Sequence, residues 1–424
     1  MHAPPHTGVM STTALSSPEA TTTAHRGVSH RTGFWIAAAA FLVVMAYSTV
    51  PTPLWSLYQQ RDGFSTFAIT VAFAAYAVGV VISLLFAGHL GDTLGRRRIL
   101  IPAIGLEIVS ALVFIVWPEL PGLIVARVVS GLGIGMLTAT VTAHILDLHL
   151  TSRPGSDPAR GQIVAGMANL GGFGVGALVS GVLARWVAGP LVVPFAVFAV
   201  LLVLALVGVA LVPETAQRPA VRPPYRPQRV RVPAAARARF FLAGGTAFAA
   251  FSVLGLFTSL APIVVAGQLH ITSRAVAGLV VFVTFAAAAL SQVVVRPLGL
   301  RAQVGLGAAL LAVGIAVLAV TVVGSLGLAA FVAGGILSGA GAGVTFKAAL
   351  AVAGSLTPAS NRGEVLAGIF LLGYIGLTVP VVGIGVATLA VSLSAALVGF
   401  AAVIVALALA TALPLVAALR RAAA

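Results

Sequence analysis

The sequence predicts an all-α membrane protein with about twelve transmembrane helices. Of its 424 residues, 60% are hydrophobic and 8% are charged, whereas a soluble domain averages about 45–50% apolar and about 25% charged residues. About twelve apolar runs reach the length of ~20 residues that a bilayer-spanning helix needs. The runs are continuous and do not alternate with polar residues, so they predict helices and not the strands of a barrel.

The charged residues fall mainly in short loops between these runs, and the loops set the predicted helix ends. The helices of the first half are expected at about 33–56, 66–88, 99–117, 121–147, 162–187 and 191–212. Those of the second half are expected at about 240–267, 274–295, 303–323, 326–353, 364–388 and 391–418. This division predicts two six-helix bundles, 33–212 and 240–424.

Two segments lack such runs. Residues 1–32 are rich in Ser, Thr, Pro and His, which predicts a disordered tail. Residues 213–239 carry seven Arg and several Pro, which predicts an extended basic linker drawn to anionic lipid headgroups.

Arginine placement predicts the orientation. The two termini, the linker and alternate loops together hold 19 of the 24 basic residues, while the loops on the other side hold only Arg61, Arg185 and Arg274. The positive-inside rule places the richer side, with both termini, in the cytoplasm.

Composition also argues against several function classes. Cysteine is absent, which excludes disulfides and thiol chemistry. The net charge of +15 is not gathered with aromatic residues on a soluble domain, so no nucleic-acid partner is expected. There is no P-loop for ATP, and His144 and His149 lack a clear third metal ligand. With a single mid-membrane acid and no catalytic cluster, we expect neither an enzyme nor a cofactor.

The most informative motif lies between the second and third predicted helices. It reads Gly88-His-Leu90-Gly-Asp92-Thr-Leu-Gly95-Arg96-Arg97. This stretch resembles the signature loop of the major facilitator superfamily, Gly-x-Leu-x-Asp-x-x-Gly-Arg-Arg/Lys. The resemblance implies the fold of that family, with two pseudo-symmetric six-helix bundles around a central cavity.

The resemblance also implies a gate. Gly88 and Gly95 permit a tight turn. Asp92 would accept hydrogen bonds from the start of the eleventh predicted helix, at about 364–388, where the helix dipole favours an anion. Arg96 and Arg97 would hold the loop against Asp147. The alternative is a charged loop that only fixes topology.

Two internal repeats support this interpretation independently. The pattern Ser130-Gly131-x-Gly133-x-Gly135 recurs as Ser338-Gly339-x-Gly341-x-Gly343, and Arg160-Gly161-x-x-x-Ala165-Gly166 recurs as Arg362-Gly363-x-x-x-Ala367-Gly368. Parallel duplication is expected of a transporter whose halves rock around a central site.

Two ionisable residues are candidates for proton coupling. Arg127 begins the pattern Arg-x-x-x-Gly-x-Gly in the fourth predicted helix, at about 121–147. This pattern resembles one that is implicated in coupling in the proton-coupled members of the family. The alternative is an Arg near the interface that snorkels to the membrane surface. Glu107 is the one acid near the middle of a predicted span. Intramembrane acids are functional candidates by default, but a structural hydrogen bond or a pair with Arg127 would also explain it.

Further residues are candidates for the cavity wall. Lys347, the sole lysine, would either snorkel or act as a cavity cation for an anionic substrate or a proton. The other candidates are Tyr47, Asn169, Phe257, Thr258 and Phe346. The fifth predicted helix, at about 162–187, partly resembles the Gly-Pro-x-x-x-Gly motif of drug/proton antiporters, with Ala177 in place of the proline.

These observations predict a monomeric alternating-access transporter in a bacterial plasma membrane. We expect proton-coupled efflux of an amphipathic or apolar small molecule. The alternative is uptake of a polar metabolite by symport or facilitated diffusion.

Overall fold

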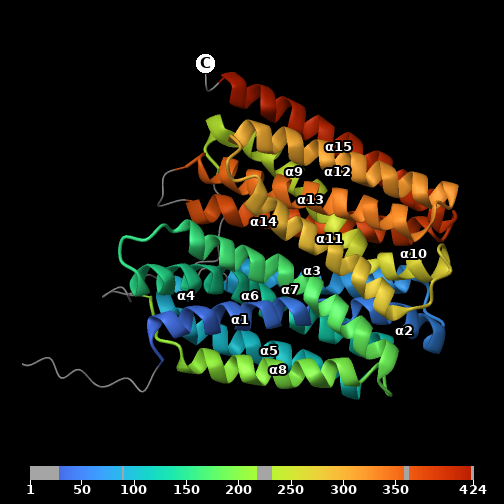
Figure 1. The fold of residues 1–424 in the computed structure, drawn as a ribbon, viewed down its shortest axis with the longest axis horizontal. Coiled ribbons are helices and arrows are strands. Elements are labelled where there is room, and N and C mark those ends of the chain that lie inside the picture. Colours follow the sequence, from blue (N-terminus) through green and yellow to red (C-terminus); the bar gives the residue numbers. More distant parts are fainter. Residues whose placement is uncertain (1–27, 88–89, 217–231, 358–361, 422–424) are drawn as a thin grey trace, which may run out of the picture.

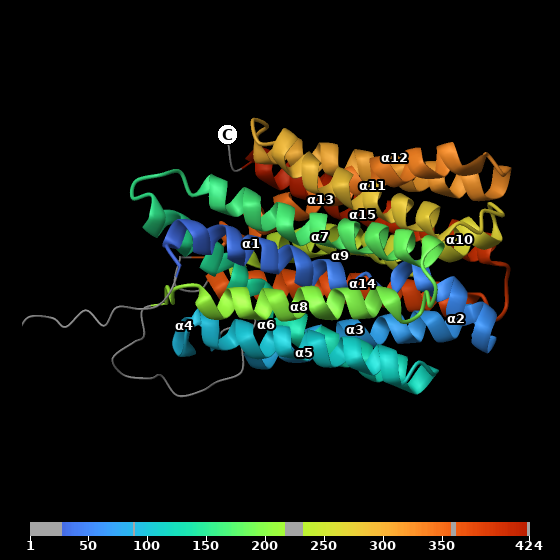
Figure 2. The same cartoon turned by 60° about the horizontal axis from the view of Figure 1, so that its bottom comes forward.

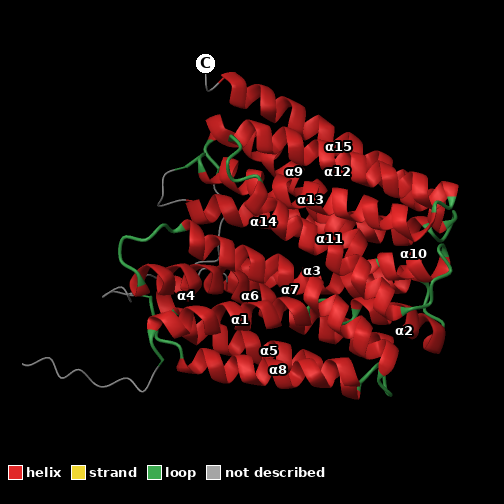
Figure 3. Cartoon of the chain, viewed as in Figure 1, coloured by secondary structure: helices red, strands yellow, loops and turns green. Residues whose placement is uncertain are grey.

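The computed structural model describes residues 28–87, 90–216, 232–357 and 362–421, except for the side chains of Asp92, Thr93 and Arg362. Within these ranges all regular structure is helical (Figure 3). The first half contains α1 (His30–Tyr47), η1 (Thr52–Leu54), α2 (Trp55–Asp62), α3 (Thr66–Ala87), α4 (Leu90–Leu94), α5 (Arg96–Val116), α6 (Leu120–Ser152), α7 (Ala159–Trp186) and α8 (Val193–Leu211). The second contains η2 (Ala234–Ala236), α9 (Arg237–Ser259), α10 (Ala261–Gly267), α11 (Arg274–Val294), α12 (Leu300–Gly324), α13 (Gly327–Gly354), α14 (Arg362–Ala387) and α15 (Leu393–Arg421).

The all-α prediction is confirmed. Twelve helical segments among the described residues are long and apolar enough to cross a membrane. They agree with the predicted spans to within a few residues, although α6 continues beyond its predicted end to Ser152. The division into a tail, two bundles and a linker stays a prediction, and most of the tail and linker lies outside the described ranges.

The helices run side by side along the length of the molecule (Figures 1 and 2). In Figure 1 the blue-to-green helices of the first half lie below the yellow-to-red helices of the second. The chain enters α1 and leaves α15 at the same end, which we call the arginine-rich end because Arg96, Arg153, Arg301 and Arg421 lie there too. The other end is called the opposite end.

Two helix pairs make most of the contact between the halves, α7 with α11 and α3 with α14. Glycines let α7 and α11 approach closely: a Cβ at Gly278 would collide with the carbonyl of Ala177, and one at Gly181 would press on the carbonyl of Arg274. A Cβ at Gly385 of α14 would likewise collide with Thr70 of α3. Close contact between backbones is the usual role of small residues in helices that pack in lipid.

The repeated glycine patterns make equivalent contacts in the two halves. A Cβ at Gly131 of α6 would collide with the carbonyl of Tyr76 in α3, and one at Gly339 of α13 would collide with the carbonyl of Thr284 in α11. The repeat found in the sequence therefore has the same packing function twice.

The middle glycine of each pattern faces a different helix. Gly133 of α6 faces α5, where a Cβ would press on Glu107. Gly341 of α13 faces α12, where a Cβ would collide with Leu311. Leu311 is therefore the counterpart of Glu107, and this position carries an acid in the first half only.

Candidate functional site: a cavity between the two halves

A cavity of about 820 Å³ lies between the halves. Its wall comes from α3, α6, α7 and the end of α1 on one side, and from α9, α11, α13 and α14 on the other. No described residue of α5, α8, α12 or α15 lines it. Its volume is in the range of small-molecule binding sites, about 300–1,000 Å³.

The cavity opens at the arginine-rich end. Its lining there includes the exposed residues Gln162, Arg296 and Gly363. The ion pair described between the halves at this end, Arg296 with Asp157, is 4.0 Å long and exposed. An exposed pair of this kind contributes little, about 0–1 kcal/mol.

At the opposite end the halves are bonded directly. Both predicted helices 1 and 7 are broken here, between α1 and α2 and between α9 and α10. Pro262 has no N–H, so it cannot donate to the carbonyl of Thr258 as a helix would require. That carbonyl accepts instead from Oγ1 of Thr52, at 2.9 Å across the two halves.

The break after α1 frees two further carbonyls. The N–H groups of Thr52 and Leu54 bond to Thr49 and Pro51, so they are not available to the carbonyls of Ser48 and Val50. The carbonyl of Val50 accepts from Oγ of Ser180 at 2.7 Å. The carbonyl of Ser48 accepts from Arg127. Buried backbone groups need such partners, and here side chains of α6 and α7 supply them.

The cavity brings together four of the predicted wall residues, Asn169, Thr258, Phe346 and Lys347, and also Arg127. Two predictions are wrong. Tyr47 is buried with its hydroxyl bonded to Ser110 at 2.8 Å, behind the wall. Phe257 turns the other way and packs on Phe331, with ring centroids 6.0 Å apart.

Four aromatic rings form one side of the cavity, which we call the aromatic wall: Phe251, Phe346, Phe370 and Tyr374. Their rings meet edge to face, with centroids 4.8 to 5.6 Å apart. Phe370 and Tyr374 were not among the predicted wall residues. Their spacing of four residues, which places both on one face of α14, was the available signal.

Arg127 is almost fully buried, with 3% of its surface exposed. Its Nη1 donates to the carbonyl of Ser48 at 2.8 Å. The guanidinium also lies 4.4 Å from the ring centroid of Tyr76 and 5.5 Å from that of Phe73, within cation–π range. Its Nε has no protein partner. Arg127 therefore faces the cavity and does not snorkel.

Glu107 is fully buried between α5 and α6 and does not line the cavity. Its Oε2 accepts from Oγ of Ser130 at 2.8 Å, while its Oε1 has no partner. No ion pair joins it to Arg127 among the described residues, although the two charges interact over a longer distance. Ser338, the counterpart of Ser130, bonds only within its own helix.

Lys347 projects from α13 at the cavity wall. Its Nζ donates to the carbonyl of Gln292 in α11 at 2.7 Å. No acid lies within ion-pair distance of it in the described part of the chain.

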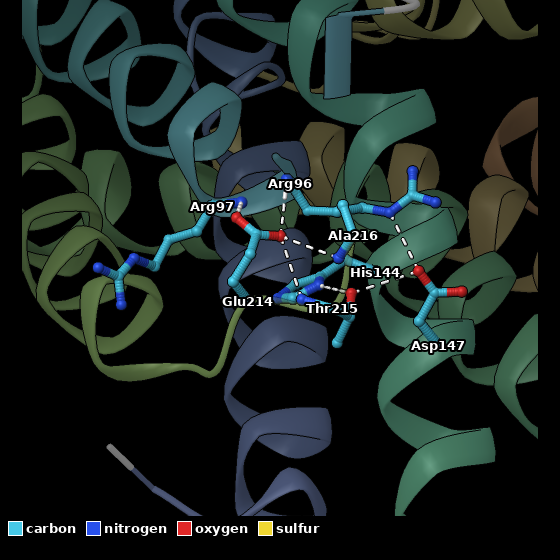
Figure 4. A network of polar contacts seen from close by, with 7 residues as sticks. All are labelled: Arg96, Arg97, His144, Asp147, Glu214, Thr215 and Ala216. Carbon is cyan, nitrogen blue, oxygen red and sulfur yellow. Dashed lines mark hydrogen bonds and ion pairs between the residues drawn. The ribbon is translucent and has the colours of Figure 1, made fainter. Parts of the chain in front are cut away.

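At the arginine-rich end, a carboxylate caps the start of α5 (Figure 4). Oε1 of Glu214 accepts from the backbone N–H of Arg96 at 2.9 Å, and Oε2 accepts from that of Arg97 at 3.1 Å. Gly95 makes this possible, since its φ is +108° and a Cβ there would lie 2.7 Å from Glu214. A helix N-terminus favours an anion, so the signature loop is fixed to the end of α8.

The same cluster includes Asp147 of α6. Nε of Arg96 donates to Asp147 at 3.1 Å, and Oγ1 of Thr215 donates to the same carboxylate at 3.3 Å. His144 contacts Thr215 at 2.8 Å. The structure thus places Arg96 against Asp147, whereas Arg97 contributes its backbone. Gly88 and the side chain of Asp92 lie outside the described residues, although Asp92 itself belongs to α4.

Glu214 was missed as a site residue because it is 118 positions away from the loop it caps. One signal was available: an acid is rare in this chain, with nine Asp and Glu in all, and Glu214 directly follows the sixth predicted helix.

Twelve candidate spans around a cavity that opens at one end define a multi-pass membrane protein with an internal binding site. Comparison with known families agrees with this class. The family model described as Major Facilitator Superfamily matches residues 36–301, well over half of the sequence. The chain belongs to the major facilitator superfamily.

Individual relatives are distant. The uncharacterized MFS-type transporter Rv1250 of Mycobacterium tuberculosis is 30% identical over 159 residues, which is 36% of this chain and 27% of that protein. The arabinose-proton symporter of Bacillus subtilis is 31% identical over 124 residues, 28% of this chain and 27% of the symporter. The chain thus aligns with about a quarter of the length of these relatives.

Two solved structures share the fold. A mutant of the nucleoside transporter NupG has a TM-score of 0.67 at 12% identity, over 90% of this chain and 98% of its own. The human organic anion transporter MFSD10 has a TM-score of 0.65 at 16% identity, over 91% and 99%. At these identities the likeness concerns the fold alone.

Proposed function

We propose that this protein exports an amphipathic or apolar small molecule across a bacterial plasma membrane by proton-coupled alternating access. The cavity between the halves carries this proposal. It is large enough for a drug-sized molecule, and aromatic, Leu and Ala residues form much of its wall. The drug/proton antiporters are the subgroup that we assign.

The positive-inside rule gives the direction in which the cavity faces. It assigns the arginine-rich end to the cytoplasm. The cavity is then open to the cytoplasm and sealed outside by Thr52, Thr258 and their neighbours. A substrate would enter from the cytoplasm or its leaflet, as export requires.

Glu107 is the proton-binding group in this proposal. A fully buried carboxyl group with one hydrogen bond is suited to taking up and releasing a proton, since each event changes a poorly solvated charge. Ser130 joins it to α6, and Arg127 lies one turn away on that helix. Arg127 holds the broken end of helix 1 through Ser48. A change in the charge of Glu107 would therefore alter how strongly Arg127 binds the Ser48 carbonyl at the outer seal.

The cluster around Arg96, Asp147 and Glu214 would form part of the cytoplasmic gate. It fixes the start of α5, which directly follows the signature loop. In the proposed outward-open state Asp92 bonds to the start of α14. Asp92→Asn should then favour the inward-open state with little loss of expression; wild-type transport together with wild-type accessibility of the gate would contradict this role.

We further propose that the arginines of the linker at 213–239 attract anionic lipid headgroups and that the chain works as a monomer.

The alternative is uptake of a polar metabolite together with protons. It is favoured by the likeness to the arabinose-proton symporter and to the glucose transporter GlcP of Staphylococcus epidermidis, which is 27% identical over 146 residues. The cavity also contains three amide side chains, from Gln162, Asn169 and Gln292, that could bond to hydroxyl groups.

Proton movement in proteoliposomes tests the proposal. A pH gradient is imposed, and a panel of amphipathic compounds and of pentoses and hexoses is added. Export by antiport predicts that an amphipathic compound moves against the proton flux. Co-movement of a sugar with protons would establish the alternative, and saturable flux with no proton movement would leave Glu107 with a structural role.

A further inference from the structure

We propose that the substrate is an organic anion, with its anionic group held at Lys347 and its apolar body on the aromatic wall. This inference rests on the proposed transport function and names the substrate class of the same cavity.

The charges of the wall are unbalanced. Among the described lining residues, Arg127, Arg296 and Lys347 are basic and Glu364 is the one acid. Glu364 lies in the first turn of α14, at the mouth, where the helix dipole already favours a negative charge. A concave site with excess charge of one sign concentrates ligands of the opposite sign.

The lysine of the wall has hydrogen-bond donors to spare. Lys347 carries three donors, and one of them is used on the carbonyl of Gln292. Arg296 is close enough to act electrostatically on Lys347, and its like charge increases the pull on an anion.

An anionic group suits these free donors. A carboxylate, sulfonate or phosphate monoester has several oxygen acceptors and accepts charge-assisted hydrogen bonds from the Lys347 ammonium. Arg127 corresponds in the repeat to Gly335, which lies about 18 Å from Lys347 along the helix axis. Arg127 therefore adds positive charge to the cavity without contacting the same group.

The rest of the wall requires an apolar body. Phe251, Phe346, Phe370 and Tyr374 offer ring edges and faces beside Lys347, which follows Phe346 directly in α13. A small inorganic anion would leave this surface in contact with water. A fused or linked pair of rings would cover it.

The same arrangement selects against other ligands. A cation would face the like charges of Lys347 and Arg296, and a neutral molecule would displace the water on Lys347 without replacing it by an acceptor. Discrimination by groups left unpaired is a general route to specificity.

A set of isosteric probes tests the inference. Biphenyl-4-carboxylate, biphenyl-4-carboxamide and 4-(aminomethyl)biphenyl differ mainly in charge. Binding to the purified full chain in nanodiscs would be measured by thermal stabilisation, and flux in proteoliposomes by scintillation counting. The variant is Lys347→Gln, and the control is Arg301→Gln, an exposed cation of α12 outside the cavity.

We expect wild type to bind the carboxylate at least about tenfold more tightly than the amide, because a hydrogen bond to a charged group contributes about 1.5–3 kcal/mol. We expect Lys347→Gln to lose about tenfold for the carboxylate and little for the amide. Arg301→Gln should match wild type for both.

Other results would overturn the inference. Equal binding of carboxylate and amide, tighter binding of the amine, or an unchanged carboxylate affinity in Lys347→Gln would each refute it. If the amide or amine is nevertheless transported with proton counterflow, export stands and only the substrate class is wrong. If none of the three probes binds or moves, the organic-anion inference fails, and sugar flux with protons in the same vesicles would also overturn the export proposal.

Discussion

Replacing Thr52 by Val should open the seal at the opposite end. Thr52 is buried, and its hydroxyl donates to the Thr258 carbonyl at 2.9 Å. Because Pro262 has no N–H, that carbonyl loses its partner when the hydroxyl is removed. A buried group left unpaired costs about 1–3 kcal/mol.

This cost applies to the sealed state, since water would reach the carbonyl when the seal opens. The ratio of sealed to open molecules should therefore fall roughly 5- to 150-fold. Valine has nearly the shape of threonine, so packing is little disturbed.

The absence of cysteine makes the assay direct. Ala261→Cys places a single thiol in the buried start of α10, beside the seal. An impermeant maleimide reacts with it only when the seal opens. The matched control is Thr321→Val, since the hydroxyl of Thr321 is buried and bonds only within α12, to Val317.

We expect the labelling rate to rise at least about fivefold in Thr52→Val and to be unchanged in Thr321→Val. If Thr52→Val is labelled at the rate of the parent, the hydrogen bond does not hold the seal and the reasoning from Pro262 is wrong.

Three further predictions concern other parts of the molecule. Glu107→Gln keeps the shape of the side chain and removes its titration, so substrate counterflow should persist while flux driven by a pH gradient falls to background; retained pH-driven flux would refute the coupling role. Glu214→Ala should lower the stability by about 1–2 kcal/mol in thermal unfolding, because it uncaps α5, whereas Glu119→Ala, at an N-cap without a side-chain bond, should not. Gly131→Ala should destabilise the protein by about 1–3 kcal/mol, since its Cβ would collide with the backbone of α3, whereas Gly105→Ala has open space; equal melting temperatures would count against the packing argument.

The helices could be predicted because lipid demands long apolar runs, and the resemblance of the signature loop was enough to bring Arg96 and Asp147 together. The interruptions of the helical path between α1 and α2 and between α9 and α10 were not predicted. Pro51, Pro53 and Pro262 are visible in the sequence, but a helix can also continue through a proline, as α5 does at Pro102. Whether a freed carbonyl finds a donor depends on another helix.

The cavity wall was only partly predictable for a related reason. These helices are apolar on all sides, so periodicity does not distinguish the face toward the cavity from the face toward a neighbour. Tyr47 and Phe257 were assigned to the wrong face on that account, and Tyr374 was overlooked. Arg127 was easier to place because a charge at that depth has few tolerable surroundings.

The pair Glu107 and Leu311 has an evolutionary consequence. Both residues fill the same niche in duplicated halves, and the glycine that makes room for each is shared. The scaffold therefore accepts a leucine or an acid there without a change of architecture. A duplicated scaffold that tolerates either residue leaves this position free to differ between the copies, so an ionisable group can stand in one half alone, and the pair then has an asymmetry on which selection for an energy source could act.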